Sequence, residues 1–422
     1  MKPTIQAVKG TREFYPEEMA VRQWLYSKIR SVSESFGYCE YDGPFLEKID
    51  LYAAKSGDEL VKEQAFVFPD RGGDLITLRP ELTPSLARMI AQKQGELVFP
   101  ARWWSFGPFW RYEKPQKGRS REFFQWNIDQ IGANSPEADA EMVAICATFF
   151  RDLGFTPREV KIMVNHRRLM DEEISRLGIA AEKHKGVTRL IDRRDKMPPA
   201  AWEKAVMDEG FTETQLDQLK ALLSDEGLWK KSGELQRFFT ALESMGVSEY
   251  VSYDPRIIRG LDYYTGIVFE AWDVGGDGRA VLGGGHYDNL VADVGGEALP
   301  GVGFAMGDVM VTLLLQKYGK IPPFKLYENT ILVTIFDESL RPASLSMASN
   351  LRNHGFHCIC YSESARLQKQ LKYADRLGVP VVLVMGPDEL QNNQVTIKDL
   401  RKHDQKTVSQ DDIVTALNQV LG

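Results

Sequence analysis

Polar and apolar side chains alternate over residues 124–129, and this stretch is the strongest candidate for chemistry in the sequence. A period of two places side chains on opposite faces of a β-strand, so one face is apolar and the other is polar. We expect the apolar face to join the core and the polar face to be open. If the polar face is covered, its groups need hydrogen-bond partners, and a ligand supplies such partners readily. The polar side chains are those of Gln125, Asn127 and Asp129.

A basic loop precedes this stretch and is predicted to face a polyanion. Between Arg102 and Arg121 the chain has six basic residues and one acidic residue, Glu113, although the whole chain has a formal net charge of −7. Such a local excess of positive charge attracts phosphate groups. The alternative is a solvated hairpin tip, which the loop by itself leaves open.

Two further segments hold residues suited to a small polar ligand, RPELT at 79–83 and RGLDYYTG at 259–266. Glu81 and Thr83 stand at the entrance of a predicted helix, where Thr83 could serve only as the helix cap. The second segment brings an arginine, an acid and two tyrosines together, which could equally be packing and an ion pair. These residues are Arg259, Asp262, Tyr263 and Tyr264.

The elements that must position these residues follow from hydrophobic periodicity and from turn signals. A helix is predicted to begin near Pro16 and to end at Gly37. Residues 65–79 are predicted to form a hairpin that turns on two glycines. A second helix is predicted to begin at Thr83 and to end at Gly95.

The middle of the chain is predicted to insert helices between two sets of strands. A helix is expected from Pro136 to about Leu153, and residues 158–250 are expected to be mostly helical and charged. Strands return at residues 251–273 and continue through glycine-rich segments. Alternating strands that a helical block interrupts imply a mainly antiparallel sheet with helices on one side.

The glycine-rich segments invite a nucleotide-loop interpretation that their details do not fit. None contains the GK[ST] sequence of a Walker loop. Gly301, Gly303 and Gly307 imitate a dinucleotide-binding fingerprint, but no βαβ pattern with an acidic residue about 20 positions later follows. We interpret these glycines as sites where the backbone approaches a ligand or a neighbouring strand closely.

Composition bounds the class of protein. The 422 residues are 43% hydrophobic and 26% charged, which predicts two or three globular domains. No apolar run is long enough to span a bilayer and the first twenty residues lack a signal core, so a cytoplasmic protein without a membrane partner is expected. The four cysteines show no CxxC spacing, which argues against a disulfide framework or a structural zinc. We predict no metal site built from the protein alone.

Taken together, the motifs resemble those of the histidyl-tRNA synthetase family, which belongs to the class II aminoacyl-tRNA synthetases. They run in order from residue 9 to residue 307, and RGLDYYTG is highly specific for this family. The resemblance implies ATP-dependent activation of L-histidine to histidyl-adenylate, followed by transfer of histidine to the 3′ end of tRNA(His). The motifs are KGTREFYP, GYCEYDGP, RPELTP, FWRYEKPQKGRSREFFQ, RGLDYYTG, GGGHYDNL and GFAMG.

The resemblance also implies a domain organisation. Residues 1–324 are similar to the family's α+β catalytic domain, with a mainly antiparallel sheet flanked by helices and a helical insertion at about 165–250. Residues 325–422 alternate strands and helices and resemble the family's C-terminal α/β anticodon-binding domain. The family works as a homodimer, and the first long helix with the strand through Pro44 resembles the motif that builds its interface.

Roles of individual residues follow from the resemblance. Adenylation joins two anions that repel each other, so the site must supply positive charge, and Arg111 and Arg259 are implied as the catalytic residues. Mg²⁺ is implied as the partner of ATP. The implied histidine-binding residues are Glu81, Leu82, Thr83, Arg111, Gln125, Asp129, Arg259, Tyr263, Tyr264 and Tyr287. The implied ATP-binding residues are Arg111, Glu113, Arg121 and Phe123, and the implied tRNA contacts are Gln116 and Arg119.

Three positions depart from the family's pattern. Asp129 stands where glutamate is usual, and His286 stands where arginine is usual. At Met310 the arginine expected on the γ-phosphate of ATP is missing. This leaves an alternative open, a synthetase-like regulatory subunit that binds histidine without charging tRNA. Such subunits typically lack the C-terminal domain and the RGLDYY residues, and this chain has both.

Overall fold

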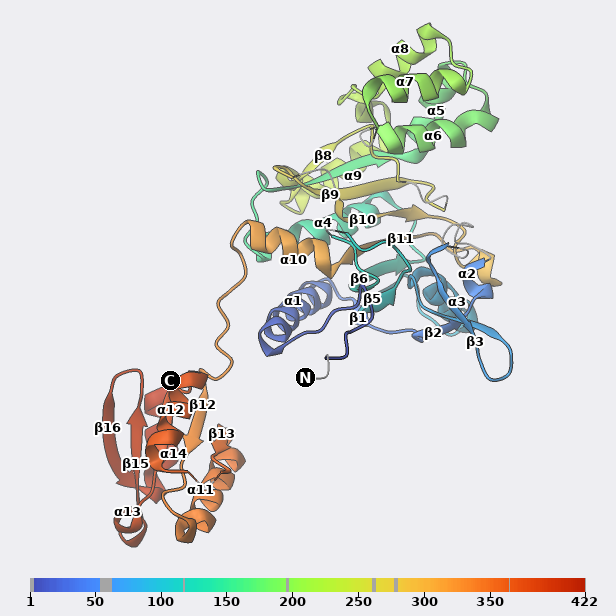
Figure 1. Ribbon diagram of the computed structural model, residues 1–422. Coiled ribbons are helices and arrows are strands. Elements are labelled where there is room, and N and C mark those ends of the chain that lie inside the picture. The colour runs from blue at the N-terminus through green and yellow to red at the C-terminus, as the bar shows by residue number, and fades with distance from the viewer. Residues whose placement is uncertain are drawn as a thin grey trace. The chain divides into compact units, whose positions relative to one another are not determined.

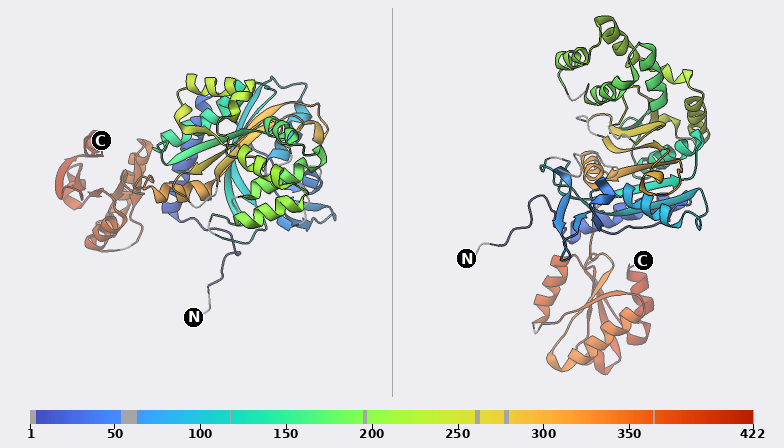
Figure 2. Two further views of the ribbon diagram at one scale, coloured as in Figure 1. Left: turned by 90° about the horizontal axis from the view of Figure 1, so that it is seen from above. Right: turned by 90° about the vertical axis from the view of Figure 1, so that its right-hand side faces the viewer.

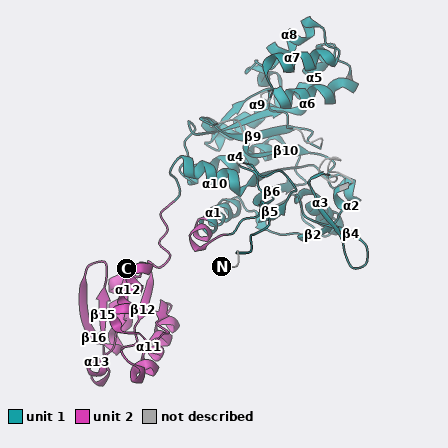
Figure 3. Ribbon diagram, viewed as in Figure 1, with its two compact units in different colours: residues 1–13, 22–321 teal, residues 14–21, 322–422 magenta. Residues whose placement is uncertain are grey.

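The computed structural model describes residues 4–53, 63–116, 118–194, 197–259, 263–276, 280–363 and 365–421. Asp262 therefore lies outside the described residues. The chain forms two compact units (Figure 3), one of residues 1–13 and 22–321 and one of residues 14–21 and 322–422. The domain boundary expected between residues 324 and 325 stays a prediction.

An eight-stranded sheet forms the centre of the first unit (Figure 1), with the strand order β1-β5-β6-β11-β10-β9-β7-β8. Only the two edge pairs, β1 with β5 and β7 with β8, are parallel. All other neighbours are antiparallel, which confirms the predicted mainly antiparallel sheet. The strands are β1 (Cys39–Glu40), β5 (Ala101–Trp110), β6 (Glu122–Ile131), β7 (Val160–His166), β8 (Val251–Tyr253), β9 (Ile267–Asp273), β10 (Ala280–Tyr287) and β11 (Gly301–Gly307).

Helices bury the apolar face of this sheet. Trp126 and Ile128 of β6 are fully buried, which confirms that the apolar side of the predicted alternation joins the core. The Trp126 ring centroid lies 5.0 Å from that of Phe149 and 4.7 Å from that of Phe304. The polar face of β6 is not open as predicted, because Asn127 and Asp129 on it are buried, with 4% and 7% of each residue exposed. The helices that contribute to this core include α1 (Pro16–Ser35), α4 (Pro136–Asp152), α9 (Gly233–Ser244) and α10 (Asp308–Lys317).

The predicted helical block is present, with one exception at its start. Helices α5 to α8 gather at one end of the sheet, beyond β8 and β9 (Figures 1 and 2). The exception is β7, a strand within residues predicted to be mostly helical. Its buried residues Val160, Ile162 and Val164 alternate and are β-branched, which favours a strand. The helices are α5 (Arg167–Arg176), α6 (His184–Arg193), α7 (Pro199–Asp208) and α8 (Glu213–Leu222).

A small antiparallel sheet with the order β2-β4-β3 lies near the start of the first unit. The predicted hairpin is confirmed as β3 and β4, and the Asp70 carboxylate closes its turn by accepting from the N–H groups of Gly72 and Asp74. The elements here are β2 (Leu46–Lys48), α2 (Asp50–Ala53), β3 (Phe66–Pro69), β4 (Leu75–Leu78) and α3 (Thr83–Lys93).

The C-terminal part of the chain forms a five-stranded sheet with the order β13-β12-β14-β15-β16 and the predicted alternation of strands and helices. The polar strand β16 was not predicted, because it is an exposed edge strand without an apolar face. Within the described ranges, no helix is long and apolar enough to cross a membrane. The elements are β12 (Thr330–Val333), α11 (Arg341–Asn353), β13 (His357–Cys360), α12 (Leu367–Leu377), β14 (Val381–Val384), α13 (Pro387–Gln391), β15 (Gln394–Asp399), β16 (Asp404–Ser409) and α14 (Ile413–Leu421).

Candidate functional site

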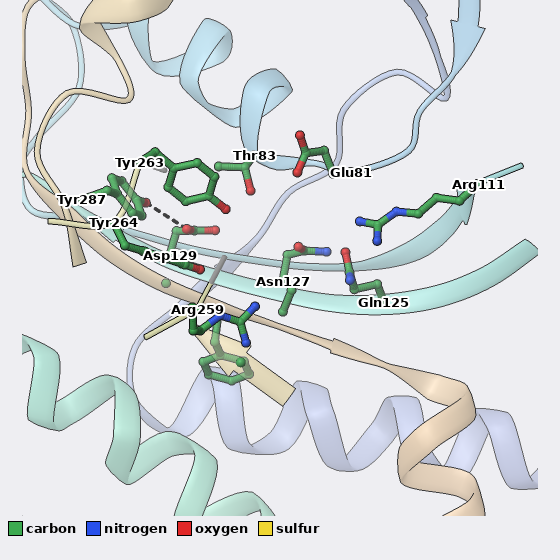
Figure 4. Close-up of a pocket in the computed structure, with 14 residues that line it drawn as sticks. Glu81, Thr83, Arg111, Gln125, Asn127, Asp129, Arg259, Tyr263, Tyr264 and Tyr287 are labelled. Atoms are coloured by element: carbon green, nitrogen blue, oxygen red, sulfur yellow. Dashed lines mark hydrogen bonds between the residues drawn. The ribbon is translucent and has the colours of Figure 1, made fainter. Parts of the chain in front are cut away.

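A cavity of about 240 Å³ lies on the polar face of the main sheet. Figure 4 shows Gln125, Asn127 and Asp129 along one strand, with three tyrosines at the Asp129 end and Arg111 at the other end. Residues from six separate stretches of the sequence meet here. The lining residues are Glu81, Thr83, Arg111, Gln125, Asn127, Asp129, Arg259, Tyr263, Tyr264, Gly283, Tyr287, Gly303, Phe304 and Ala305.

The floor of the cavity is shaped by small residues on β11. Asp129 and Asn127 of β6 pair with Gly303 and Ala305. A Cβ atom added at Gly303 would lie 2.0 Å from Oδ1 of Asp129, so only glycine leaves room for the carboxylate. The close approach expected at this glycine is therefore an approach to a side chain of the neighbouring strand.

Asp129 is a buried acceptor with an altered acidity. Its Oδ1 accepts a hydrogen bond of 2.9 Å from the hydroxyl group of Tyr287. Burial raises the pKa of Asp129 to about 7, and the hydrogen bond from Tyr287 lowers it only in part. Tyr263 stands beside this pair, with ring centroids 4.7 Å from Tyr264 and 6.4 Å from Tyr287. This end of the cavity combines aromatic walls with a carboxylate that can accept or release a proton near neutral pH.

Arg259 places its guanidinium over the sheet. Its Nη1 atom lies 3.0 Å from Oε1 of Glu270 and occupies the space of a side chain at position 283, where an added Cβ would lie 1.3 Å away. The residue has a φ of 54°, in the left-handed region that costs a non-glycine residue about 1 kcal/mol or more. The backbone is held there by Arg167, whose Nη1 donates to the carbonyl groups of Ile258 and Arg259. This backbone conformation directs the guanidinium of Arg259, which is always charged, to the cavity.

The start of α3 forms another wall, and here the alternative that Thr83 serves only as the helix cap is wrong. Thr83 is the first residue of the helix, the cap position is Leu82, and no side chain caps the helix. The Thr83 side chain instead lines the cavity together with Glu81. Across from them, Nε of Arg111 donates to the carbonyl oxygen of Pro80 at 3.0 Å.

The side chain of Leu82 is not among the lining residues, although it was predicted to bind histidine. Only 1% of Leu82 is exposed, and its Cδ1 would lie 3.4 Å from a Cβ added at Gly43. The first turn of the helix points this side chain into the protein, so only its backbone could reach a ligand.

The residues predicted for ATP and tRNA lie on the loop between β5 and β6 and at the start of β6. The guanidinium carbon of Arg111 lies 5.5 Å from the ring centroid of Phe123. Nη1 of Arg119 lies 2.9 Å from Oε2 of Glu113, so a predicted tRNA contact and a predicted ATP contact pair with each other.

The same loop is anchored at its end and closed at its tip. The backbone N–H of Arg121 donates to Gly10. At the tip, Gln116 and Arg119 exchange backbone hydrogen bonds.

The prediction omitted five lining residues, and one of them was detectable. Asn127 belongs to the same period-two alternation as Gln125 and Asp129 and shares their face. The other four are defined by strand pairing between distant parts of the chain, which a single sequence does not display. They are Gly283, Gly303, Phe304 and Ala305.

Two of the departures noted in the sequence have structural explanations. Nδ1 of His286 lies 2.8 Å from Oδ1 of Asp139, and both side chains are buried. Burial by itself lowers the pKa of His286, but the adjacent Asp139 carboxylate outweighs it and the pKa is raised. His286 can thus carry a positive charge beside Asp139, as the arginine usual at this position would. Met310 packs against the main apolar core.

Comparison with known proteins gives a consistent result along the whole chain. A family model described as histidyl-tRNA synthetase matches residues 10–309, and a model described as an anticodon binding domain matches residues 328–420. A histidine–tRNA ligase of Thermoplasma volcanium is 37% identical over 428 residues, covering 98% of this chain and 99% of the relative. A chloroplastic/mitochondrial histidine–tRNA ligase of Arabidopsis thaliana is 35% identical, covering 98% and 86%.

Solved structures are similar in fold. The histidyl-tRNA synthetase of Nostoc sp. PCC 7120 superposes with a TM-score of 0.82 at 25% identity, covering 99% of this chain and 100% of that chain. A protein of Bacillus halodurans C described as an ATP phosphoribosyltransferase regulatory subunit/histidyl-tRNA synthetase has a TM-score of 0.74 at 20% identity, covering 88% and 97%. At that identity the second likeness concerns the fold alone.

Proposed function

The chain belongs to the histidyl-tRNA synthetase family, and from this premise we propose that it is a histidine–tRNA ligase. It activates L-histidine with ATP to histidyl-adenylate and transfers histidine to the 3′ end of tRNA(His). One observation supports this most directly: nine of the ten residues predicted to bind histidine line a single cavity, Leu82 being the exception.

The imidazole ring of histidine belongs at the Asp129 end of the cavity. A buried carboxylate beside the hydroxyl group of Tyr287 offers an acceptor to a ring N–H. The pKa of about 7 at Asp129 is close to the value of a free imidazole, about 6.5, so the two groups can share a proton at neutral pH. An amino acid without ring nitrogens would leave these buried polar groups unpaired, which is a strong basis for rejection.

The ammonium group belongs near Glu81, Thr83 and Gln125, which supply one carboxylate and neutral acceptors. The carboxylate then faces Arg111 and Arg259. Adenylation needs both cations because the histidine carboxylate attacks an α-phosphate that is itself negative. Arginine suits this position because its planar fork binds paired oxygens and it stays charged at every relevant pH.

ATP belongs beside the histidine site, with its adenine ring on Phe123 and its outer phosphates near Arg121. Glu113 would accept from the adenine amino group. We propose that Mg²⁺ enters with ATP, bound through phosphate oxygens and water, where it neutralises phosphate charge. The lining fits this arrangement because the two carboxylates among its described residues, Glu81 and Asp129, are assigned to histidine.

The wider assembly is also a proposal. Residues Gln116 and Arg119 would contact the acceptor end of the tRNA, and the chain would act in the cytoplasm as a homodimer. An apolar face on the small sheet supports the dimer. It is formed by Leu46, Phe66, Phe68, Ile76 and Leu78, all partly or largely exposed and paired in register.

The regulatory alternative is less well supported. Relatives named histidine–tRNA ligases cover nearly the whole chain, including the part matched by the anticodon-binding model. Both Arg111 and Arg259 line the cavity, which suits adenylation, where two anions must be brought together, better than the binding of histidine alone.

Pyrophosphate exchange into ATP tests the proposal, because exchange requires reversible formation of the adenylate. Among the standard amino acids, only histidine should support it. Arg259→Ala should lower kcat by at least about 10², with a smaller change in histidine affinity, because the cation acts on charge that develops in the transition state. Arg256→Ala is a matched control, since that side chain is bound to Asp254 and does not line the cavity. Wild-type protein that binds histidine without exchange would contradict the ligase function.

A further inference from the structure

The side-chain amide of Asn127 is a buried donor aimed into the cavity. Only 4% of the residue is exposed, and among the residues that the structure describes no group accepts a hydrogen bond from its Nδ2. A buried donor without a partner lowers stability, so it is rarely retained without a purpose. The neighbours on both adjacent strands, Ser105 and Ala305, are small and leave the space above the amide to the cavity.

Strand register identifies which part of a ligand meets this amide. Asn127 pairs with Ala305 on β11, and Ala305 pairs with Gly283 on β10. Directly paired residues point to the same face of a sheet, and neighbouring strands lie about 4.8 Å apart. The Arg259 guanidinium fills the side-chain space of Gly283. Asn127 and Gly283 therefore stand in one row across the sheet, about 10 Å apart at the backbone with Ala305 between them, and the Arg259 guanidinium lies at the Gly283 end of this row.

The residues on either side of Asn127 are assigned to the imidazole and ammonium groups of histidine, which leaves the carboxylate for Asn127. Asp129, two residues along β6, carries the imidazole acceptor. Gln125, two residues in the other direction, lies toward Glu81 and Arg111 (Figure 4). The row that holds Asn127 also holds the cation assigned to the carboxylate.

We propose that Nδ2 of Asn127 donates a hydrogen bond to the carboxylate of histidine, and to the carbonyl oxygen of the same group in histidyl-adenylate. This rests on the proposed function and adds a third carboxylate-binding residue to Arg111 and Arg259. A neutral donor suits the position, because it orients one oxygen without adding another charge that would compete with Arg259. The contact also discriminates against compounds that keep the ring and ammonium group of histidine but lack its carboxylate.

The test compares histidine with histidinol, in which an alcohol replaces the carboxylate, by calorimetric titration of the full-length chain. Asn127→Ala should weaken histidine binding by at least about tenfold, since hydrogen bonds to charged groups are the strong ones. It should change histidinol binding by less than about twofold. Asn127→Asp should weaken histidine binding further, because two carboxylates would face each other, and should not weaken histidinol binding.

A matched control is Asn165→Ala, which removes a buried amide that donates to Pro255 outside the cavity. It should affect both ligands equally or not at all. Equal losses of both ligands in Asn127→Ala, or an unchanged affinity for histidine, would overturn the proposal. If Asn127→Ala does not fold, the isosteric Asn127→Asp gives the same contrast. Wild-type protein that binds histidine without pyrophosphate exchange would refute the ligase function instead. The comparison of histidine with histidinol binding would still test the role of Asn127 in that case.

Discussion

Asp129 illustrates how a single residue serves binding at the expense of stability. Its carboxylate is enclosed by β11 and Tyr287, and burial holds its pKa at about 7 instead of its ordinary 3.8. Between these two values the folded chain binds more protons than the unfolded chain, so this group's contribution to stability falls as pH rises and levels off above pH 7. Under the proposed function, this cost is offset because the carboxylate accepts a hydrogen bond from the imidazole of histidine.

Asp129→Asn should therefore raise the free energy of unfolding at pH 8. The increase should be smaller at pH 5, where the Asp129 carboxyl is largely protonated in the folded chain. The expected gain at pH 8 is about 1–4 kcal/mol, the upper end corresponding to the full pKa shift. Histidine binding should weaken by at least about tenfold, because the amide is a poorer acceptor than the carboxylate. Urea unfolding at the two pH values and histidine titration check both effects. A variant that is less stable than wild type at pH 8 would mean that the carboxylate is better solvated than its burial indicates.

At the scale of elements, the parts that could be predicted are those with local periodicity. The alternation on β6 predicted its core face and the polar face that lines the cavity. The turn between β3 and β4 could be predicted from its two glycines. For Thr83 the local sequence left capping open as an alternative, because a helix start looks the same whether its first polar residue caps the helix or faces a cavity. The position of Arg259 over Gly283 depends on pairing between strands distant in sequence, and no local pattern encodes it.

Asp308 lies two residues before Met310, the position that lacks the expected arginine. It connects α10 to the N-terminal segment and to the start of β6. Its carboxylate, at the start of α10, lies 2.9 Å from Nη2 of Arg12 and accepts a 2.9 Å hydrogen bond from the N–H of Phe124. Phe124 follows the predicted adenine-binding residue Phe123. These contacts of Asp308 hold the start of β6 in place. Met310, which stands where the family has an arginine, packs against the apolar core instead.

Asp308→Ala should consequently raise the KM for ATP more than the KM for histidine. Loss of the carboxylate removes the hydrogen-bond acceptor of the buried Phe124 N–H and an ion-pair partner of the partly buried Arg12. This should destabilise the protein by about 1–3 kcal/mol. We expect the KM for ATP in pyrophosphate exchange to rise about 3- to 10-fold, with less than a twofold change for histidine. Asp308→Asn, which keeps an acceptor for Phe124, is the control and should show the smaller effect. Equal changes for both substrates would mean that the contacts of Asp308 support the whole site and not the ATP side.

At the scale of the whole molecule, the exposed apolar face of the β2-β4-β3 sheet predicts self-association. Phe68 is 40% exposed on that face, and a patch of this kind marks an interface. Phe68→Asp should shift a dimer toward monomer in sedimentation velocity. Leu75→Asp is a matched control, because Leu75 is 53% exposed on the opposite face of the same sheet. Identical behaviour of the two variants would exclude this face as the interface.

The two reactions of the enzyme should separate along the chain. Residues 327–421 contribute buried clusters of their own, which include Ile331, Leu383 and Leu417. Among the described residues, the cavity on the main sheet is lined by residues between 81 and 305. Removing residues 325–422 should thus leave histidine-dependent pyrophosphate exchange within about threefold of wild type. Charging of tRNA(His) should fall by at least about 10², because the proposed anticodon contacts lie in the removed part. Histidine titration of the truncated chain provides the control for an intact cavity. Parallel losses of exchange and charging, with histidine binding retained, would show that these residues act in adenylation itself rather than in holding the tRNA.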